Sequence, residues 1–281
     1  MGKSKLPLSA GHDARSFSER FSLRFWRLWK RLSQQIGRSE SRLQILVAGQ
    51  QRSGTNMLME VLDWSQHTDV IHETDPRGFV RYEMRPIAEI QALAQCSNAP
   101  CFVIKSLCEL DQLGSLMDTL APAKTLWIVR NFDDSVRSMI RSFGGFAEQT
   151  RRISMYGPEG TWRSRGMSDE TRSLIQCLYR ADMSEASAAA LMWYYRNVLF
   201  FERGLGHDPR VHLVFYEDMV QQPEVEFERI FRYLDIPEWS PWICRKIYAR
   251  SVRNTPVDAI APEVREVCEA LLARFQAVRT T

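Results

Sequence analysis

The stretch Leu43-Gln-Ile-Leu-Val-Ala-Gly-Gln-Gln-Arg-Ser-Gly-Thr-Asn-Met-Leu-Met-Glu-Val-Leu62 decides the fold. Residues 43–48 form a short apolar run, which is the pattern of a strand buried on both faces of a parallel sheet. After a turn that contains Gly49 and Gly54, apolar residues recur at spacings of three and four and predict a helix. A strand, a glycine turn and a helix form an anion cradle, because backbone N–H groups and the helix dipole converge at the turn.

The turn fits the phosphate-loop formula G-x-x-x-x-G-K-[ST] except at one position. Gly49 and Gly54 have the required separation, but Thr55 stands where the formula has lysine, and Arg52 is the nearest fixed positive charge. A nucleotide hydrolase uses that lysine with Mg²⁺ on the β- and γ-phosphates, so such chemistry is disfavoured and no metal site is predicted. A strand-turn-helix unit without a ligand is the alternative.

Composition limits the domain organisation and the partners. The chain has 281 residues, 44% of them hydrophobic, which suits one large α/β domain with a buried core. A formal net charge of +3 argues against a general polyanion-binding surface, so no nucleic-acid partner is expected. The six cysteines show no C-x-x-C pair and no metal-ligand spacing with the five histidines. This favours reduced cysteines in a cytoplasmic protein, with a disulfide between two of them as the alternative.

Residues 1–41 are predicted to form a basic extension ahead of a catalytic domain at 42–281. The chain shows neither a membrane-spanning run nor the apolar core of a signal peptide. Between 15 and 36, basic residues border one apolar helical stripe, which consists of Phe17, Phe21, Phe25, Leu28, Trp29, Leu32 and Ile36. A helix of this kind lies on an anionic membrane surface, binds a partner, or packs back on its own domain, and the three alternatives stay open.

Strand and helix patterns alternate along the rest of the chain. A short strand begins at Asp69, and further strands are predicted at 101–104, 124–129 and 211–216. Helices are predicted at 111–120, 134–143, 184–204, 223–234 and 262–278. Residues 144–170 carry glycines and arginines and are expected to form an exposed insertion. The alternation predicts an α/β fold, with a parallel β-sheet flanked by helices.

Residues that directly follow the strands are the candidate site, because ligands of such folds bind at the carboxyl ends of the strands. The set comprises Arg52, Ser53, Thr55, Glu73, Lys105, Ser106, Arg130, Ser138, Tyr216 and Glu217. Its cations and one well-placed carboxylate suit the transfer of a compact anionic group better than hydride or acyl transfer. No G-x-G-x-x-G, G-x-S-x-G or H-E-x-x-H motif supports those other classes.

The loop resembles the 5′-phosphosulfate loop of sulfotransferases that use 3′-phosphoadenosine 5′-phosphosulfate (PAPS). The similar stretch is Gly49-Gln-Gln-Arg-Ser-Gly-Thr-Asn-Met-Leu58. The resemblance implies donor contacts from Arg52, Ser53, Gly54, Thr55 and Asn56.

Two later segments strengthen the resemblance. Ile128-Val-Arg-Asn-Phe-Asp-Asp-Ser-Val-Arg-Ser138 is similar to the family's 3′-phosphate motif, which implies that Arg130 and Ser138 hold that phosphate. Val214-Phe-Tyr-Glu-Asp-Met219 is similar to the family's Tyr-Glu-Asp-Leu segment, which implies a cofactor contact of Tyr216. The resemblance covers about residues 43–252. It implies a P-loop NTPase-like sulfotransferase fold with PAPS as the donor and no metal.

Within the superfamily the chain is most similar to the tyrosylprotein branch and related bacterial sulfotransferases. Asp69-Val-Ile-His-Glu-Thr74 matches the segment of the branch's catalytic glutamate, which implies that role for Glu73. Lys105 follows its strand like the branch's active-site lysine. Ser251, after Arg250, resembles the late serine that contacts the cofactor near the reacting centre.

The chain departs from the branch at two positions. Ser142 stands where the branch has an arginine four residues after the 3′-phosphate serine, and Arg141 lies one residue earlier. Ala261 replaces the late lysine that precedes a proline. The nucleotide contacts at the C-terminal end therefore stay open, with Arg250 and Arg253 as candidate replacements.

The implied reaction moves a sulfuryl group to an acceptor hydroxyl. A carboxylate beside the hydroxyl accepts its proton as a general base, and Glu73 is the candidate, with His72 and His67 as alternatives. Arg52, Lys105 and the loop N–H groups would stabilise the charge on the leaving oxygen, and Ser251 would add a hydrogen bond.

Two other functional classes and the identity of the acceptor stay open. A P-loop kinase or other nucleotide-binding protein would need a loop lysine and a metal-binding aspartate; a non-catalytic membrane-surface scaffold would work through residues 15–36. The acceptor is a carbohydrate, a peptide tyrosine or a small molecule. An anionic glycan or peptide is favoured by four arginines, Arg151, Arg152, Arg163 and Arg165, unless these only face solvent.

Overall fold

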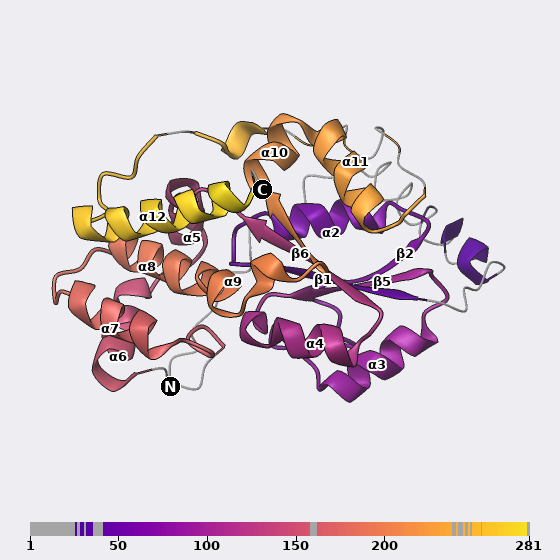
Figure 1. Ribbon diagram of the computed structural model, residues 1–281, viewed down its shortest axis with the longest axis horizontal. Helices are drawn as coiled ribbons and strands as arrows, with labels where there is room; N and C mark the ends of the chain where they lie inside the picture. Colours follow the sequence, from indigo (N-terminus) through magenta and orange to yellow (C-terminus); the bar gives the residue numbers. More distant parts are fainter. Residues whose placement is uncertain are drawn as a thin grey trace, which may run out of the picture.

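Five parallel strands form the centre of the protein (Figure 1). The computed structural model describes residues 26, 29–30, 32–35, 42–157, 162–237, 240, 244, 247, 249–253 and 255–279. The sheet order is β2-β5-β1-β6-β7, built from β1 (Leu43–Gly49), β2 (Thr68–Ile71), β5 (Cys101–Ser106), β6 (Ala123–Val129) and β7 (Val211–Phe215). The predicted α/β fold with a parallel sheet flanked by helices is confirmed.

The central strand β1 determines where a ligand crevice forms. Ile45 and Val47 belong to the core on one face of the sheet, and Leu46 and Ala48 to the core on the other face. Because consecutive side chains of a strand point to opposite faces, an unbroken apolar run fills both cores. The chain runs from β1 to the edge strand β2, returns through β5 on one side of β1, and then crosses to β6 on the other side. This change of direction opens a crevice beyond the carboxyl end of β1, at Gly49.

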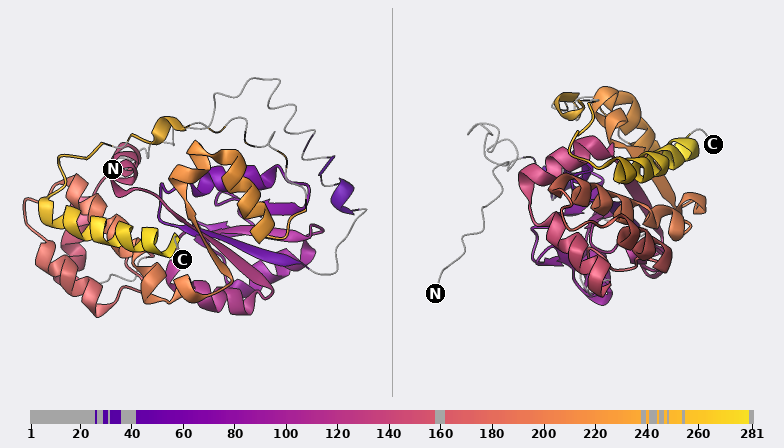
Figure 2. Two further views of the ribbon diagram at one scale, coloured as in Figure 1. Left: turned by 45° about the horizontal axis from the view of Figure 1, so that its top comes forward. Right: turned by 90° about the vertical axis from the view of Figure 1, so that its left-hand side faces the viewer.

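Helices cover both faces of the sheet (Figures 1 and 2). One face carries α2 (Thr55–Asp63), α10 (Tyr216–Gln221) and α11 (Pro223–Tyr233), whose apolar residues share a core with Val47. The opposite face carries α3 (Ile87–Cys96), α4 (Leu113–Thr119), α5 (Phe132–Ser142), α8 (Glu185–Asn197) and α12 (Pro262–Arg279). Helices α5, α8 and α12 gather beyond the end of β6, so they border the crevice from that side.

The prediction of an exposed insertion at 144–170 is wrong. The segment contains α6 (Phe146–Tyr156), which packs against α8 and buries Phe146 and Ile153, and α7 (Asp169–Leu178) begins near its end. Gly145 and Gly157 flank α6 with φ of 80° at each. Glycine is favoured at helix ends because it adopts positive φ without strain, so these glycines mark helix boundaries.

The single helix predicted at 184–204 is divided. Helix α8 ends at Asn197, and α9 (Leu199–Glu202) and the 3₁₀ turn η2 (Leu205–His207) follow. The Asn197 side-chain amide donates to the Trp193 carbonyl at 2.8 Å, and such local bonds compete with the helical backbone ladder. The remaining short elements are a hairpin of β3 (Phe79–Val80) and β4 (Glu83–Met84), and the 3₁₀ turns η1 (Leu110–Gln112) and η4 (Ala249–Ser251).

The described part of the N-terminal segment packs back on the domain. Trp26 lies 6.0 Å from Trp64 between ring centroids, and the ammonium group of Lys30 donates to the Asp63 carbonyl at 2.7 Å. Lys30 is only 5% exposed, whereas the stripe residues Trp29 and Leu32 are 44% and 52% exposed. The other predicted stripe residues, Phe17, Phe21, Phe25, Leu28 and Ile36, lie outside the described residues. Contact of 15–36 with a membrane stays a prediction.

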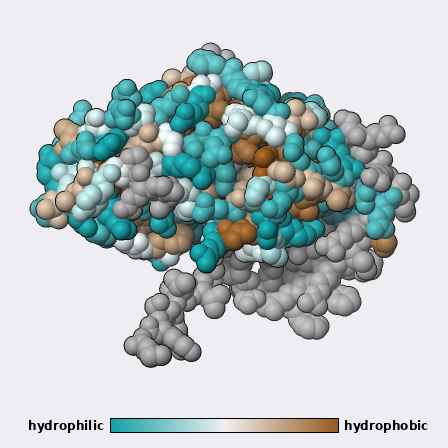
Figure 3. Space-filling view, turned by 90° about the horizontal axis from the view of Figure 1, so that it is seen from below, coloured by the Kyte–Doolittle hydropathy of each residue, from teal (hydrophilic) through white to brown (hydrophobic). Residues whose placement is uncertain are grey.

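The surface and the cysteines show the following features. Figure 3 shows a mainly hydrophilic face with a few apolar spots between polar side chains. Among the described residues, no helix combines the length and apolarity needed to cross a bilayer. All six cysteines are free, four of them buried.

Candidate active site

At two positions of the loop between β1 and α2, Gly49 and Gly54, the neighbouring atoms leave no room for a side chain. A Cβ atom on Gly49 would lie 2.6 Å from the Ile128 carbonyl oxygen, and one on Gly54 would lie 2.3 Å from the Tyr216 ring. Gly54 and Arg52 also adopt left-handed backbone, with φ of 103° and 70°. These torsions bend the loop tightly around the start of α2. The loop thus has the form of an anion cradle, as predicted.

Donor groups of the cradle remain available for a ligand. No side chain caps the N-terminus of α2. The hydroxyl of Ser53, a residue that is 2% exposed, has no hydrogen-bond partner in the described part of the chain. A buried hydroxyl without a partner is costly, so an anion seated on the cradle would satisfy both the hydroxyl and the backbone N–H groups. Thr55 and Asn56 are the first two residues of α2, next to this point.

Glu73, Lys105 and Asn56 meet beside the cradle. The Lys105 ammonium donates to a Glu73 carboxylate oxygen at 2.5 Å and to the Asn56 side-chain oxygen at 2.6 Å. Its side chain is 4% exposed, whereas that of Glu73 is 25% exposed. The lysine is therefore held at the floor of the site, and the carboxylate remains open to an incoming molecule.

Arg52 and Arg130 form the second half of the site. The Arg52 side chain donates to the Ser138 hydroxyl at 2.9 Å, and the Arg130 guanidinium donates to the Arg52 carbonyl at 3.1 Å. Arg130 also lies 4.2 Å from the centroid of the Tyr216 ring and donates to the Ser251 carbonyl at 2.9 Å. The Tyr216 and Ser251 hydroxyls are hydrogen-bonded. Two loops, two strand ends and α5 thus converge on one point.

The electrostatics of the site favour an anion. Burial, and then the positive charge of Arg130, lower the pKa of Arg52, and Arg141 contributes in the same direction. Burial also lowers the pKa of Lys105, which Glu73 partly opposes. Both pKa shifts mean that burial makes the charged forms of Arg52 and Lys105 less stable than in water. A bound anion would offset this loss by its attraction to the two positive charges. Among the described residues, no group of three or more His, Cys, Asp and Glu side chains has a metal-binding arrangement.

The alternatives to Glu73 as a base lie in other surroundings. His67 directly precedes β2, whereas Gly49 is the last residue of β1. Because all five strands are parallel, His67 lies at the amino-terminal ends of the strands and Gly49 at their carboxyl ends. The His72 ring lies 3.7 Å from an Asp63 carboxylate oxygen, at the end of α2. Of these three residues, only Glu73 contacts Lys105.

Two buried side chains support the end of β6 and the turn after it. Glu217 accepts the backbone N–H of Asn131 at 2.9 Å, which holds the turn after β6. Trp193 is 1% exposed. Its indole N–H also donates to the Arg130 carbonyl at 2.9 Å, a contact that the apolar pattern of its helix did not indicate.

At the C-terminal positions that differ from the family pattern, the backbone contacts α8 and α5. The Ala261 N–H donates to the Ser187 hydroxyl at the start of α8. Arg253 is exposed, and its N–H donates to an Asp134 carboxylate oxygen at 3.1 Å. The Arg250 side chain lies outside the described residues.

A hollow of about 200 Å³ lies beside the loop. Gln51 of the loop, the turn Phe143–Gly145 and the first turns of α6 line it, together with Arg152 and Arg163. Glu148 also lines the hollow, and both Arg151 and Arg152 pair with it, at 2.7 Å and 3.9 Å. Arg165 pairs with Asp111 at 3.2 Å.

The comparison with known protein families agrees with this geometry. The family model described as "Sulfotransferase domain" matches residues 42–266, which is most of the chain. The chain belongs to the sulfotransferase family. It is therefore an enzyme of sulfuryl transfer, and the family takes PAPS as its donor. No match to a curated protein reaches significance.

Solved sulfotransferase structures share the fold. The sulfotransferase domain of the Synechococcus PCC 7002 olefin synthase is 14% identical, with a TM-score of 0.54 over 84% of this chain and 97% of that domain. The sulfotransferase domain from the curacin biosynthetic pathway is 13% identical, with a TM-score of 0.52 over 83% and 99%. A Mycobacterium avium sulfotransferase is 12% identical, with a TM-score of 0.50 over 92% and 81%. Because the sequence identities are this low, these comparisons show only that the chain shares its fold with the three structures.

Proposed function

We propose that this sulfotransferase moves a sulfuryl group from PAPS to an acceptor hydroxyl, with Glu73 as the general base. The main support is the convergence of Glu73, Lys105 and Arg52 beside a cradle whose buried Ser53 hydroxyl lacks a partner in the described part. PAPS supplies an activated sulfuryl group, and adenosine 3′,5′-bisphosphate is what remains of it.

The residues of the site suit the two ends of this donor. The cradle, with Ser53, Gly54, Thr55 and Asn56, would hold the 5′-phosphosulfate through N–H and hydroxyl groups. Arg130 and Ser138 would hold the 3′-phosphate, and both already belong to one hydrogen-bonded chain through Arg52. Tyr216 and Ser251 would support the nucleotide from the opposite side.

The proposed roles follow from the charges. The Glu73 carboxylate pairs with the buried Lys105 ammonium and is itself 25% exposed, so it is placed to accept the proton of an acceptor hydroxyl. Lys105, Arg52 and the loop N–H groups are fixed before the reaction begins. They would stabilise the negative charge that grows on the leaving oxygen.

The hollow beside the loop is the proposed acceptor side. Gln51 directly precedes Arg52 in the chain, and the charged lining residues are Arg152, Arg163 and Glu148. Arg151 and Arg152 lie 2.7 Å and 3.9 Å from the Glu148 carboxylate, so two cations against one carboxylate leave the lining with a net positive charge. An acceptor with acidic groups near its hydroxyl, such as an acidic peptide or glycan, fits this lining.

Calorimetry and transfer assays test the donor and the base together. Adenosine 3′,5′-bisphosphate should bind without magnesium, and Arg130→Ala should weaken that binding by about tenfold or more, through loss of a charge-assisted contact. Glu73→Gln should lower transfer by about 10²–10⁴-fold and leave nucleotide binding intact. Arg232→Ala and Glu224→Gln, on exposed positions of α11, are the matched controls. No nucleotide binding by the wild-type protein would refute the proposed donor, and full activity of Glu73→Gln would refute the base.

A panel of hydroxyl acceptors with labelled PAPS tests the acceptor side. Arg152→Glu and Arg163→Glu should raise KM about tenfold for acidic acceptors and little for neutral ones. Equal effects on both acceptor classes would refute the preference for an anionic acceptor.

A further inference from the structure

An irregular segment of chain crosses the C-terminal side of the site. It comprises residues 251–253 and 255–257 and is called the strap below. Apart from Ser251 at the end of η4, its residues belong to no helix or strand. Its position therefore depends on contacts with side chains of other elements.

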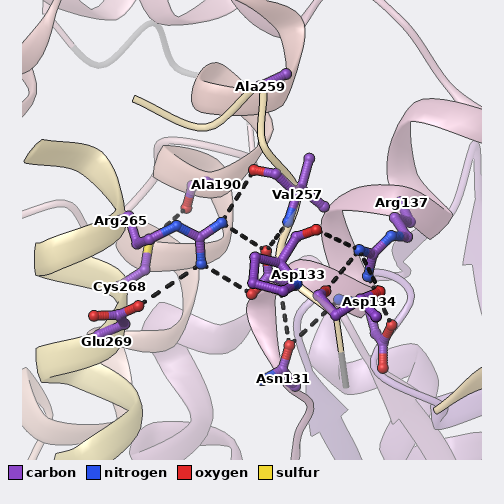
Figure 4. Close-up of polar contacts among 12 residues, drawn as sticks. Asn131, Asp133, Asp134, Arg137, Ala190, Val257, Ala259, Arg265, Cys268 and Glu269 are labelled. Carbon is purple, nitrogen blue, oxygen red and sulfur yellow. Dashed lines mark hydrogen bonds and ion pairs between the residues drawn. The ribbon is translucent and has the colours of Figure 1, made fainter. Parts of the chain in front are cut away.

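The first of these contacts comes from Asp133, in the first turn of α5 (Figure 4). Its carboxylate accepts the Val257 N–H at 2.7 Å and two N–H groups of Arg265, at 2.9 and 3.1 Å. Arg265 belongs to α12, and it also donates to the Val257 carbonyl at 3.0 Å. Asp133 is 8% exposed, so this carboxylate ties the strap to both helices away from water.

Asp134 and Arg137 form a second contact, one turn along the same helix. An Asp134 oxygen accepts the Arg253 N–H at 3.1 Å, and the other accepts from Arg137 at 3.2 Å. The Arg137 guanidinium also donates to the Thr255 carbonyl at 2.6 Å and to the Pro256 carbonyl at 2.8 Å. Asp134 and Arg137 of α5 thus hydrogen-bond to backbone groups of the strap at Arg253, Thr255 and Pro256.

The strap and the donor site share their supports. At its first residue, the Ser251 carbonyl accepts from Arg130 and the Ser251 hydroxyl is bonded to Tyr216. Ser138, which contacts Arg52, follows Arg137 directly in α5. Helix α5 therefore holds the strap through Asp133, Asp134 and Arg137, and it also supplies Ser138 to the donor site.

Acidic residues at a helix N-terminus are common, because they complement the helix dipole. Here Asn131 already provides the cap, since its side chain accepts the N–H groups of both Asp133 and Asp134. The two carboxylates instead accept backbone N–H groups that lie 124 and 119 residues further along the chain. Local capping does not account for these long-range bonds.

We propose that Asp133, Asp134 and Arg137 are positioning residues that hold the strap closed over the bound nucleotide. They act through the strap, by keeping Ser251 at its contacts with Arg130 and Tyr216. The inference rests on the proposed donor, adenosine 3′,5′-bisphosphate being its desulfated form. It also gives the nucleotide side of the site a support that does not need the late lysine that Ala261 replaces, because residues of α5, together with Arg265 of α12, secure the strap.

Limited trypsin digestion of the full chain tests the contacts directly, because Arg253 is an exposed cleavage site on the strap. Asp133→Asn and Arg137→Lys should each speed cleavage after Arg253 by about tenfold. This corresponds to a loss of about 1.4 kcal/mol in the free energy that favours the closed strap over the open one. Cleavage after Arg232 in α11 should stay unchanged. Adenosine 3′,5′-bisphosphate should slow the cleavage after Arg253 in the wild-type protein. Glu269→Gln, whose carboxylate is exposed and lies 3.7 Å from Arg265, is the matched control.

Binding and turnover separate positioning from general stability. Both variants should raise the Kd of adenosine 3′,5′-bisphosphate about tenfold, with kcat at saturating PAPS unchanged. Unchanged cleavage and unchanged Kd in both variants would overturn the proposal. Faster cleavage at every site would also overturn it, since that pattern indicates a merely structural role. Failure of the wild-type protein to bind the nucleotide would instead refute the proposed donor, while the digestion without nucleotide would still show whether α5 secures the strap.

Discussion

Gly54 shows how strongly single residues shape the cradle. A side chain there would meet the Tyr216 ring at 2.3 Å and would have to adopt φ of 103°. Gly54→Ala should therefore lower the free energy of unfolding by about 2–4 kcal/mol, measured by urea denaturation. Gly114→Ala is the control, because Gly114 lies in α4 with no atom near its Cβ position. That change should stabilise the protein by about 0.5–1 kcal/mol, and equal effects of the two changes would contradict the close packing of Gly54.

Lys105 gives the site a testable pH dependence. Burial lowers its pKa from the ordinary lysine value, so the ammonium loses its proton at a lower pH than an exposed lysine does. If the ammonium stabilises the leaving oxygen, transfer should fall as pH rises through this lowered pKa. Lys105→Arg, whose side chain stays charged, should be slower at neutral pH but should lose the alkaline fall in a pH–rate profile. An alkaline fall that persists unchanged in Lys105→Arg would assign the titration to another group.

At the scale of elements, α8 supports the end of β6 through one hydrogen bond. The Trp193 indole donates to the Arg130 carbonyl, and both groups are buried. Trp193→Phe leaves that carbonyl without its donor. Trp127→Phe is the matched control, because Trp127 is equally buried and its indole nitrogen has no partner in the described part.

We expect Trp193→Phe to cost about 1–3 kcal/mol more in unfolding free energy than Trp127→Phe. It should also weaken binding of adenosine 3′,5′-bisphosphate, because Arg130 loses its support. The comparison is made by thermal denaturation and calorimetry. Equal losses of stability, with nucleotide affinity retained in both variants, would show that the hydrogen bond adds nothing beyond packing.

Helix α6 is the element that sequence patterns assigned least well. The alternation of apolar runs and helical spacings identified most strands and helices, because a strand buried on both faces has a strong local signature. Around α6, glycine was interpreted as a loop signal. Gly145 and Gly157 instead bound a helix whose buried residues are few, Phe146, Thr150 and Ile153. Local composition could not distinguish these cases, since glycine with positive φ occurs in both.

At the scale of the whole molecule, the described residues of the N-terminal segment contact the domain near the end of α2 and the start of β2. Lys30 donates to the Asp63 carbonyl and to the Thr68 hydroxyl, and Gln34 donates to the Gln66 and Thr68 carbonyls. These contacts join Lys30 and Gln34 to the end of α2 and the start of β2. We propose that residues 42–281 form the catalytic domain and that 1–41 is a basic extension ahead of it.

Lys30→Met should therefore loosen the extension without affecting catalysis. Loss of the buried ammonium should cost about 1–3 kcal/mol of unfolding free energy, measured by urea denaturation, with turnover unchanged. Leu32→Ala, at a position that is 52% exposed, should change stability by about 0.5 kcal/mol or less. A loss of turnover in Lys30→Met at constant stability would connect the extension to the active site instead.

The sequence by itself determined the cradle, the parallel sheet and the identity of the charged strand ends. These depend on local rules: an apolar run becomes a buried strand, and two glycines at a set separation become a phosphate-type loop. Only the tertiary structure decided that Lys105 pairs with Glu73, that Trp193 supports Arg130, and that α5 secures the strap. Each of these contacts joins residues that are 32 to 124 positions apart. Such pairs form only once the strand order has brought their elements together, so no local pattern contains them.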